Sequence, residues 1–523
     1  MPHLSTILRR GAVSVVTVLF ASMLVPGGAS ADLQSDLAND VREFFDVGRS
    51  SVPRADCGPG SMPEPGLQGD VPAADRNNGR SRQGYSCNMS LLGSPGEARG
   101  SGLVSASFEN CIYSSTLFPG IVFGEPGLRV FDATDPARPV QTAVLAEPAM
   151  AWGTWESLKV NPKRKLLAAT AVPTGMSAGY FSVYDISDCA HPRLLNPGVG
   201  TNLLQPMPFL SHEGGFSPDG NTYWATGVAP GLLTGIDISD PVNPRIISQN
   251  VTGLTAHGFG ISDDGNRMYM SVAAGITTLD ISEVQSRKRD PQVYHLGRLF
   301  WMDGQATQHS IPVTYGGKQH VFTIDEAGAG GVKLIDVSDD AEPRFVSKLK
   351  LEINLLEHQD SALASGMGGS GFGYNPHYCS ADRSVDPTAL ACGWGQSGIR
   401  VFDVRDPANI RELGYLNPPA RTWGQLGLPN SPHAWASLEG PPVVDPVAIG
   451  RAMVEGQFNP LEAISPRSLW LALGDLSADW CMSPPAFRGN QILVTCSDNG
   501  PMVMQFENGV YAAPDNQLST VGS

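Results

Sequence analysis

The sequence predicts an all-β protein, a seven-bladed β-propeller with an N-terminal extension and long loops over one face. Two observations lead to this prediction. The chain contains 59 Gly and 42 Pro among 523 residues, and only 16% of its residues are charged, which is typical of a folded, turn-rich chain. A strand-turn-strand pattern also recurs at intervals that suit one propeller blade.

The repeat is an apolar strand that ends in aspartate and is followed by a turn, usually with a proline. Six copies occur, and successive aspartates are 43 to 67 residues apart. These aspartates are Asp132, Asp185, Asp237, Asp280, Asp336 and Asp403. Because aspartate and serine can hydrogen-bond to nearby backbone and proline ends strand pairing, we interpret the aspartates as structural. Each one is expected at the end of the third strand of a blade.

The ends of the propeller follow from the same repeat. A seventh, degenerate copy at 491–507 has a second and a third strand but no fourth. Residues 85–92 precede the first blade and can supply that strand, which closes the ring and removes two exposed sheet edges. The predicted propeller therefore spans residues 85–507, between an extension at 32–84 and a tail at 508–523.

Residues 1–31 have the features of a signal peptide. Arg9 and Arg10 precede an apolar run at 11–25, and the small residues at 29–31 fit a cleavage site. The run is too short for a spanning helix, so no transmembrane anchor is expected after cleavage. The two arginines leave open whether the chain is exported unfolded or folded. We expect a secreted or cell-envelope protein that is monomeric.

The charge balance argues against two classes of partner. With 51 acidic and 35 basic residues, the formal charge is −16 at pH 7. An acidic chain repels both nucleic acid and anionic membrane surfaces. We therefore expect a small-molecule substrate or a surface ligand, and no nucleic acid.

Eight cysteines in an exported chain predict four disulfides. Cys379 and Cys392 flank a turn-rich stretch, and Cys481 and Cys496 lie almost symmetrically about a second turn, so each pair can bridge neighbouring antiparallel strands. Cys57 with Cys87 is expected to tie down the extension. Elimination then pairs Cys111 with Cys189.

One polar residue recurs at the start of the proposed inner strands. In blades three to six it is a histidine, namely His212, His257, His309 and His377, and in blade two it is Glu156. An alignment through nearby cysteines assigns Glu109 to blade one and Asp479 to blade seven. Since the start of an inner strand faces the central channel, these residues are expected to form a ring around the axis.

Four imidazoles and three carboxylates around one axis suit a metal ion. Imidazole is a good ligand for iron, copper or zinc, and a carboxylate behind it fixes its tautomer and raises its basicity. We therefore predict one transition-metal ion, iron or copper with zinc as a further choice, bound by the four histidines with the carboxylates behind them. A second interpretation is equally open: repeated histidines can simply form hydrogen bonds between blades.

Two long loops, 352–376 and 417–478, each enter an inner strand and are expected over the same face. His358 and His433 lie in these loops, and the second loop also contains Trp423 and Trp435. These four are candidates for a lid that gates a substrate. Ordinary alternatives are solvent-exposed histidines and tryptophans that pack a long insertion.

The six strand-Asp repeats, with their Ser-Asp-x-x-x-Pro continuation, resemble the LVIVD-repeat family over residues 85–507. That resemblance implies a propeller and indicates little about activity. The count of four histidines and three carboxylates is similar to the iron centre of carotenoid-cleaving propeller oxygenases. Histidines at blade starts are similar to those of selenium-binding-protein and methanethiol-oxidase propellers. The full motif of neither group occurs, so both similarities concern architecture.

Two functions from different classes are consistent with the sequence. The first is an exported propeller with a histidine-ringed metal site, a metal-dependent oxidoreductase or lyase that acts on a small molecule. The second is a non-catalytic secreted or surface scaffold whose loops bind a protein or glycan. The ring of histidines favours the first function, and the generic repeats favour the second.

Overall fold

The computed structural model describes residues 44, 46, 48–95, 104–115, 127–151, 153–154, 156–171, 180–196, 211–228, 231–253, 255–328, 330–358, 373–419, 478–497 and 499–515. All of these except residue 44 belong to one unit, Asp46–Ser523. The predicted signal peptide, residues 1–31, lies outside the described residues, as does most of the two long loops. Within the described residues, no helix is long and apolar enough to cross a bilayer.

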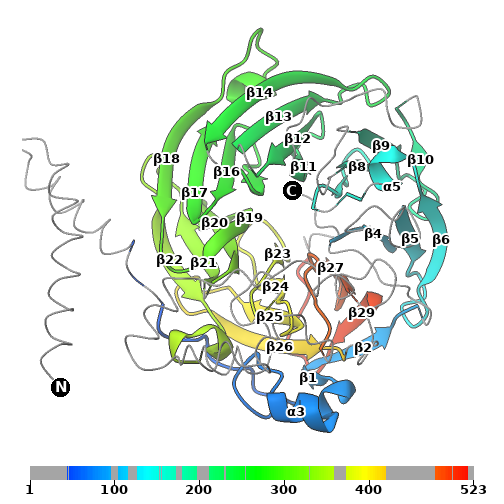
Figure 1. Cartoon of the computed structure of the whole chain (residues 1–523), viewed down its shortest axis with the longest axis vertical. Coiled ribbons are helices and arrows are strands. Elements are labelled where there is room, and N and C mark those ends of the chain that lie inside the picture. Colours follow the sequence, from blue (N-terminus) through cyan, green and yellow to red (C-terminus); the bar gives the residue numbers. More distant parts are fainter. Residues whose placement is uncertain are drawn as a thin grey trace, which may run out of the picture. The chain divides into compact units, whose positions relative to one another are not determined.

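Seven antiparallel sheets form a ring of blades, which confirms the predicted seven-bladed propeller (Figure 1). Blade one consists of β3 (Ser105–Phe108), β4 (Cys111–Ser114), β5 (Leu128–Asp132) and β6 (Val140–Leu145). Blade two consists of β7 (Lys159–Asn161), β8 (Leu166–Thr170), β9 (Phe181–Asp185) and β10 (Arg193–Leu194). Blades three and four consist of β11 (Ser211–Phe216), β12 (Thr222–Gly227), β13 (Gly231–Asp237), β14 (Arg245–Gly253), and of β15 (Phe259–Ile261), β16 (Arg267–Val272), β17 (Gly275–Asp280), β18 (Tyr294–Phe300).

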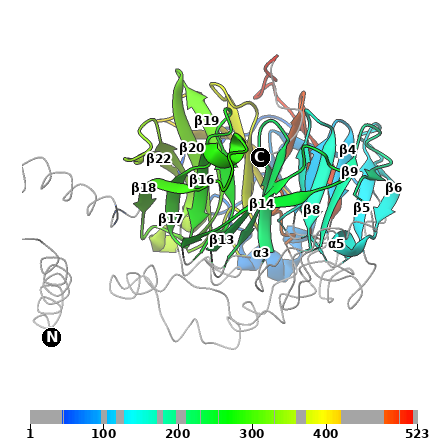
Figure 2. The same ribbon diagram turned by 90° about the horizontal axis from the view of Figure 1, so that it is seen from above.

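The remaining three blades repeat this order from the inner to the outer strand (Figures 1 and 2). Blades five and six consist of β19 (Gln305–Tyr315), β20 (Lys318–Ala327), β21 (Gly331–Asp336), β22 (Arg344–Leu349), and of β23 (Tyr378–Ala381), β24 (Ala389–Gly393), β25 (Ile399–Asp403), β26 (Arg411–Asn417). Blade seven contains β27 (Ala486–Arg488), β28 (Gln491–Cys496) and β29 (Gly500–Phe506). The helical segments described are short: α3 (Ala73–Asn78), α5 (Pro148–Ala151), α7 (Ser282–Gln285), η1 (Arg80–Gln83), η2 (Glu352–Asn354) and η3 (Leu356–His358).

The segment expected to close the ring is divided between two blades. β2 (Met89–Gly93) pairs with β29 and is the fourth strand of blade seven. β1 (Tyr85–Cys87) instead pairs with β26 as a fifth strand of blade six. The break falls at Asn88, whose φ of 56° is left-handed and bends the chain between the two strands. Its side-chain amide donates to the carbonyls of Asp56 and Leu413.

The repeated aspartates are structural, as interpreted from the sequence. In all six repeats the carboxylate accepts a hydrogen bond, 2.8 to 3.2 Å long, from the backbone N–H two residues further along the chain. The side chain thereby satisfies the backbone of the turn that leads to the outer strand. These turns leave the start of each inner strand, at the opposite end of the repeat, available for other residues.

The hydrophobic core lies between neighbouring blades. Phe322 and Leu334 of blade five, for example, pack in one cluster with Leu390 and Phe402 of blade six. Burial of a side chain of this size contributes about 1.5–3 kcal/mol. Adjacent blades therefore stabilise each other across their faces, and the polar residues are left for the inner edge.

The structure contains the four predicted disulfides. These are Cys57–Cys87, Cys111–Cys189, Cys379–Cys392 and Cys481–Cys496. Cys379 and Cys392 face each other directly on β23 and β24, as the hairpin argument requires. No cysteine is left as a free thiol.

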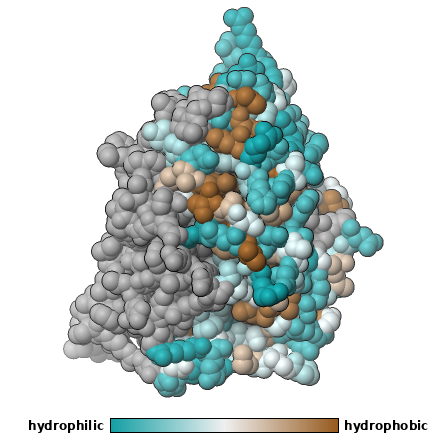
Figure 3. Space-filling view, turned by 90° about the vertical axis from the view of Figure 1, so that its right-hand side faces the viewer, coloured by the Kyte–Doolittle hydropathy of each residue, from teal (hydrophilic) through white to brown (hydrophobic). Residues whose placement is uncertain are grey.

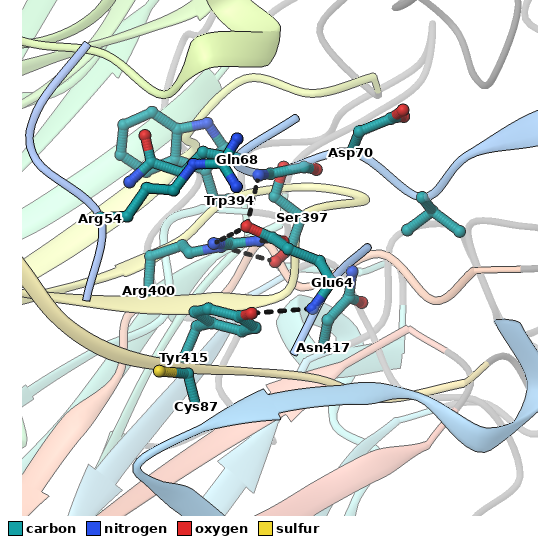
Figure 4. A network of polar contacts seen from close by, with 12 residues as sticks. Arg54, Glu64, Gln68, Asp70, Cys87, Trp394, Ser397, Arg400, Tyr415 and Asn417 are labelled. Atoms are coloured by element: carbon teal, nitrogen blue, oxygen red, sulfur yellow. Dashed lines mark hydrogen bonds and ion pairs between the residues drawn. The ribbon is translucent and has the colours of Figure 1, made fainter. Parts of the chain in front are cut away.

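The N-terminal extension is attached to blade six by a buried charged group, the Arg400 cluster (Figure 4). It comprises Glu64 and Gln68 of the extension with Arg400 on β25 and Glu412 on β26. The guanidinium donates to both oxygens of Glu64 and to Glu412 Oε1, and Gln68 donates to Glu412 Oε2 at 3.0 Å. The Arg400 guanidinium also lies 4.1 Å from the centre of the Tyr415 ring. Every charge in this group has an opposite partner.

The outer surface of the ring is mixed. On the side shown in Figure 3, hydrophobic residues form separate patches among hydrophilic ones. Val140 and Val144, on the outer strand β6, are 60% and 46% exposed. Scattered exposed apolar residues of this kind are ordinary in folded proteins.

Candidate metal centre

The predicted ring position lies where the inner strands begin. His212 is on β11 and His309 on β19, whereas His257 and His377 come just before β15 and β23. Glu156 precedes β7, and its backbone forms a parallel bridge with Glu213 of the next blade. The repeat therefore places these residues at the beginning of the inner strands of successive blades.

Three of the four histidines surround Glu156. His212 Nε2 is 2.9 Å from Glu156 Oε2, and His257 Nε2 is 3.5 Å from the same oxygen. On the other side, His377 Nε2 is 2.8 Å from Glu156 Oε1. The glutamate is only 1% exposed. One buried carboxylate is thus shared by the imidazoles of three blades.

Glu326, at the end of the second strand β20, completes what we call the His/Glu cluster: Glu156, His212, His257, Glu326 and His377. Its Oε2 is 3.0 Å from His377 Nε2, and its Oε1 is 3.9 Å from His257 Nε2. Sequence reasoning missed this residue because it followed only the inner strands. The available signal was a pair of acidic residues, Asp325 and Glu326, that ends an otherwise apolar stretch.

Two atoms at the centre of the cluster form no hydrogen bond with a described residue, although both lie within ion-pair distance of a neighbour. Neither Glu156 Oε2 nor His257 Nε2 makes a hydrogen bond of acceptable geometry to any described residue, although both atoms are buried. Leaving a buried polar atom unpaired costs about 1–3 kcal/mol. The ligand atoms fall into two sets, Glu156 with His212 and His257, and Glu156 with Glu326 and His377, each within 4.8 Å of one another. Buried sets of this kind can bind a metal ion.

A backbone carbonyl fixes the orientation of the His377 ring. Its Nδ1 lies 3.1 Å from the backbone carbonyl of Met482. A hydrogen bond from Nδ1–H to that carbonyl directs the lone pair of Nε2 toward the two glutamates. Histidines that bind metals are commonly held in this way.

The electrostatics of the cluster stabilise opposite charges. Burial lowers the pKa of His257, but the Glu326 and Glu156 carboxylates outweigh it and raise the pKa to about 9. Burial likewise lowers the pKa of His377, and the same two carboxylates raise it to about 10. Burial raises the pKa of Glu156, yet His212 and His377 hold it well below its usual range. Without a metal, protons on the imidazoles balance the carboxylates.

His309, the fourth predicted ligand, belongs to a neighbouring group. Its Nδ1 is 2.9 Å from Glu213 Oε1, which also lies 3.2 Å from Lys159 Nζ. Gln308 donates to the other oxygen of Glu213 at 3.3 Å. Burial lowers the pKa of His309 and outweighs the attraction of Glu213, which favours a neutral ring. Among the described residues, His309 is in neither set of ligand atoms.

Irregular strand pairing directs neighbouring residues of one strand, such as His212 and Glu213, toward the axis of the propeller. The register of β11 shifts between Ser211 and Gly214, at His212 and Glu213. β19 has a similar shift before His309. Such bulges re-aim side chains near functional sites. Gly258 makes room for the result, because a Cβ there would lie 2.0 Å from Glu213 Oε2.

Two of the predicted carboxylates lie elsewhere. Glu109 is exposed, in the turn between β3 and β4 with a φ of 51°. The cysteine alignment was wrong there, because Cys111 opens the second strand of its blade, whereas Cys379 lies on an inner strand. Asp479 is buried before β27, but its carboxylate accepts hydrogen bonds from the backbone of Trp480 and from Asn499.

The lid candidates are largely outside the described residues. His433, Trp423 and Trp435 all lie there. His358 is described at the end of η3, where its side chain is 28% exposed and lies 3.7 Å from Glu357 Oε1. Its role as a lid residue remains a prediction.

No protein-family model matches the chain, so the LVIVD resemblance rests on the repeat pattern alone. No curated protein matches it by sequence either. Solved structures with a similar fold include a functionally unknown protein from Desulfotomaculum acetoxidans (12% identity, TM-score 0.41, 60% of this chain and 84% of that one). Others are the periplasmic gluconolactonase of Pseudomonas aeruginosa (13%, 0.41, 62% and 81%) and a Lactobacillus plantarum protein (13%, 0.38, 59% and 86%). Values this low carry no argument about function.

Proposed function

We propose that this protein is an exported β-propeller that binds a transition metal in the His/Glu cluster and uses it for redox or lyase chemistry on a small molecule. The observation that supports this most is the buried, unpaired couple of Glu156 Oε2 and His257 Nε2, 3.5 Å apart. Two atoms that each lie about 2.1 Å from one ion are about 3–3.5 Å apart. The separations of 2.9 and 3.5 Å around Glu156 Oε2 suit such an ion.

The donor set limits the choice of metal. The cluster offers imidazole nitrogens and carboxylate oxygens, which suit iron, copper or zinc. All eight cysteines are in disulfides, so no thiolate competes for the ion. We favour iron or copper, because redox chemistry requires an ion with two accessible oxidation states.

Two members of the cluster are partly exposed. The side chains of His212 and Glu326 are 17% and 21% exposed, whereas those of Glu156 and His377 are 1% and 2% exposed. A small molecule can therefore approach past the first two residues. A bound transition-metal ion supplies Lewis acidity or a redox couple there. The chain contributes the oriented imidazole of His377 and the buried Glu213–Lys159 pair, which keeps the adjacent wall of the site neutral.

Export is supported by the disulfides. Four buried or partly buried disulfides form and persist in an oxidising compartment and are rare in the cytosol. The proposed signal peptide at 1–31 provides the route. Together they support a location outside the cytoplasm.

The metal content of the purified protein tests this proposal. The chain is produced in an oxidising compartment, and bound metals are measured by elemental mass spectrometry in the parent and in His257→Gln. We expect at least one transition-metal ion per chain in the parent and a marked loss in the variant. His358→Gln is the matched control and should keep the parent's metal content, because His358 lies outside the cluster.

The scaffold alternative gives the opposite result. If the histidines only hold blades together, the parent contains no metal and acquires none from iron(II), copper(II) or zinc(II) in solution. His257→Gln then lowers the melting temperature without any change in metal content. That combination would overturn the proposed function.

A further inference from the structure

We propose that the His/Glu cluster is a binuclear site, in which Glu156 and Glu326 bridge two divalent transition-metal ions. The inference rests on the proposed function and deepens it, because it fixes the number of ions and the role of each carboxylate. It departs from the single ion that the sequence predicts. The argument depends on which oxygen of each glutamate faces which histidine.

Glu156 divides its two oxygens between two groups of histidines. Oε2 faces His212 and His257 at 2.9 and 3.5 Å, and Oε1 faces His377 at 2.8 Å. A carboxylate that binds a single ion through one oxygen leaves the other oxygen for a hydrogen-bond donor. Here both oxygens face imidazole Nε2 atoms, which carry protons in the absence of a metal and can bind one when those protons are displaced.

Glu326 repeats this division. Its Oε2 lies 3.0 Å from His377 Nε2, and its Oε1 lies 3.9 Å from His257 Nε2. The first oxygen therefore belongs with the His377 side and the second with the His257 side. Two carboxylates that each present one oxygen to each side form a pair of bridges.

One ion cannot use all of these ligands. Ligands about 2.1 Å from a common ion are at most about 4.2 Å apart. Among the described residues, the ligand atoms form two sets within 4.8 Å that share Glu156, rather than one set of five. The first ion would be held by Glu156 Oε2, His212, His257 and Glu326 Oε1, and the second by Glu156 Oε1, Glu326 Oε2 and His377. Two-metal sites with shared carboxylates typically separate their ions by about 3.5–4 Å.

The unpaired atoms support the first ion independently. Glu156 Oε2 and His257 Nε2 are buried and have no hydrogen-bond partner among the described residues. His377 supports the second ion, because its Nδ1 is occupied by the Met482 carbonyl and its Nε2 is left to face two carboxylates. Each half of the cluster thus contains a ligand that its surroundings direct to the centre.

A manganese titration distinguishes one ion from two. The full chain is freed of metal by a chelator and titrated with Mn²⁺, the bound ions are counted by elemental mass spectrometry, and electron paramagnetic resonance reports whether they interact. We expect about two ions per chain with the spectrum of an exchange-coupled pair. One ion per chain would overturn the binuclear site and leave the proposed function standing. Two ions without coupling would overturn the bridges, and no binding of Mn²⁺, iron(II), copper(II) or zinc(II) would overturn both proposals.

Single substitutions then assign the ligands. His212→Gln and Glu326→Gln should each lower the count to about one ion and replace the coupled spectrum with that of an isolated Mn²⁺ ion. His320→Gln is the matched control, since His320 is a buried histidine on the same strand as Glu326 whose Nδ1 pairs with the carbonyl of Lys318. It should keep two coupled ions. If either cluster variant keeps two coupled ions while folded, the assignment is wrong; if either fails to fold, the coupling in the parent still decides.

Discussion

The protein buries two groups of charged side chains, and they differ in how completely they are paired. In the Arg400 cluster, both oxygens of Glu64 and of Glu412 accept hydrogen bonds, and the guanidinium supplies three of these six bonds. In the His/Glu cluster, Glu156 Oε2 and His257 Nε2 have no hydrogen bond to a described residue. All carboxylate oxygens of the first group are hydrogen-bonded as the chain folds. The second group leaves a carboxylate oxygen and an imidazole nitrogen without a hydrogen bond to a described residue, and a bound ion can satisfy both.

This difference separates a structural from a functional use of buried charge. A buried charge is tolerated in a folded protein when side chains of opposite charge contact it. A fully paired cluster can therefore have a purely structural role. A buried polar atom without a hydrogen bond lowers stability, and a bound ligand can offset that cost. The two clusters should therefore respond in opposite ways to substitution.

The largest effect on stability is expected at Arg400. Arg400→Leu leaves Glu64 and Glu412 buried without their cation, which should lower the free energy of unfolding by about 3–5 kcal/mol. Urea unfolding of parent and variant measures the change, and the metal content should stay the same. Replacing Glu64 and Glu412 by glutamine in the same chain should restore much of the loss. A variant as stable as the parent would show that the cluster does not hold the extension.

The second largest effect is expected at Glu156 and should be seen in metal binding. Glu156→Gln keeps the size of the side chain but removes the shared charge, so the affinity for Mn²⁺ should fall. The loss should exceed the roughly 10- to 100-fold that is typical when a residue that only hydrogen-bonds to a metal ligand is replaced. The unfolding free energy of the metal-free variant should change by only about 1 kcal/mol, because His257 and His377, whose pKa values Glu156 raises, can release their protons once its charge is gone. A loss of stability as large as that of Arg400→Leu would make the His/Glu cluster structural.

Gly258→Ala tests the packing that supports the cluster. The added Cβ would lie 2.0 Å from Glu213 Oε2 and 2.3 Å from the backbone oxygen of Gln308. We expect a loss of about 1–3 kcal/mol in unfolding free energy, as for other overpacked sites. Gly66→Ala, whose Cβ would make only an ordinary contact 3.5 Å from Pro72, should have little effect. Equal melting temperatures for the two variants would contradict this account.

The smallest effect concerns a paired carboxylate outside both clusters. Burial raises the pKa of Asp237, but hydrogen bonds from Ser239 and Arg245 and the charge of Arg287 outweigh it and lower the pKa to about 2. Because the folded pKa is below the ordinary value of 3.8, the stabilisation is present above about pH 4 and is lost as the pH falls toward 2. Solvent screening limits it to about 1 kcal/mol. In Asp237→Asn, the difference in urea midpoint between pH 6 and pH 3 should be smaller than in the parent.

The repeat made the fold predictable, and departures from the repeat hid part of the site. The aspartate turns and the cysteine spacing follow from local chemistry, so the blades and the disulfides could be predicted. The phase of His212, His257 and His377 likewise follows from the position of the inner strands. The bulge that turns Glu213 inward is a matter of strand register, which the repeat pattern does not encode.

Glu326 and His309 also show what the repeat pattern cannot predict. Glu326 reaches the cluster from a second strand, where no repeated position marks it. His309 has the repeated position, yet it pairs with Glu213, which also binds Lys159, in another group. Both outcomes depend on which side chains of neighbouring blades meet, and that information is tertiary.

The pairing of β2 with β29 also determines when the propeller ring can close during folding. Met89 lies opposite Phe506, so the ring joins strands from nearly opposite ends of the chain. Closing a loop of this length is slow because of its entropy, and contacts of such long range slow folding. Six blades can form in sequence as the chain emerges, but the seventh must wait for residues 500–506. Until then β2 lacks its partner strand, and its edge is exposed to other chains. We therefore expect the late steps of folding to be the ones at which the protein depends on chaperones.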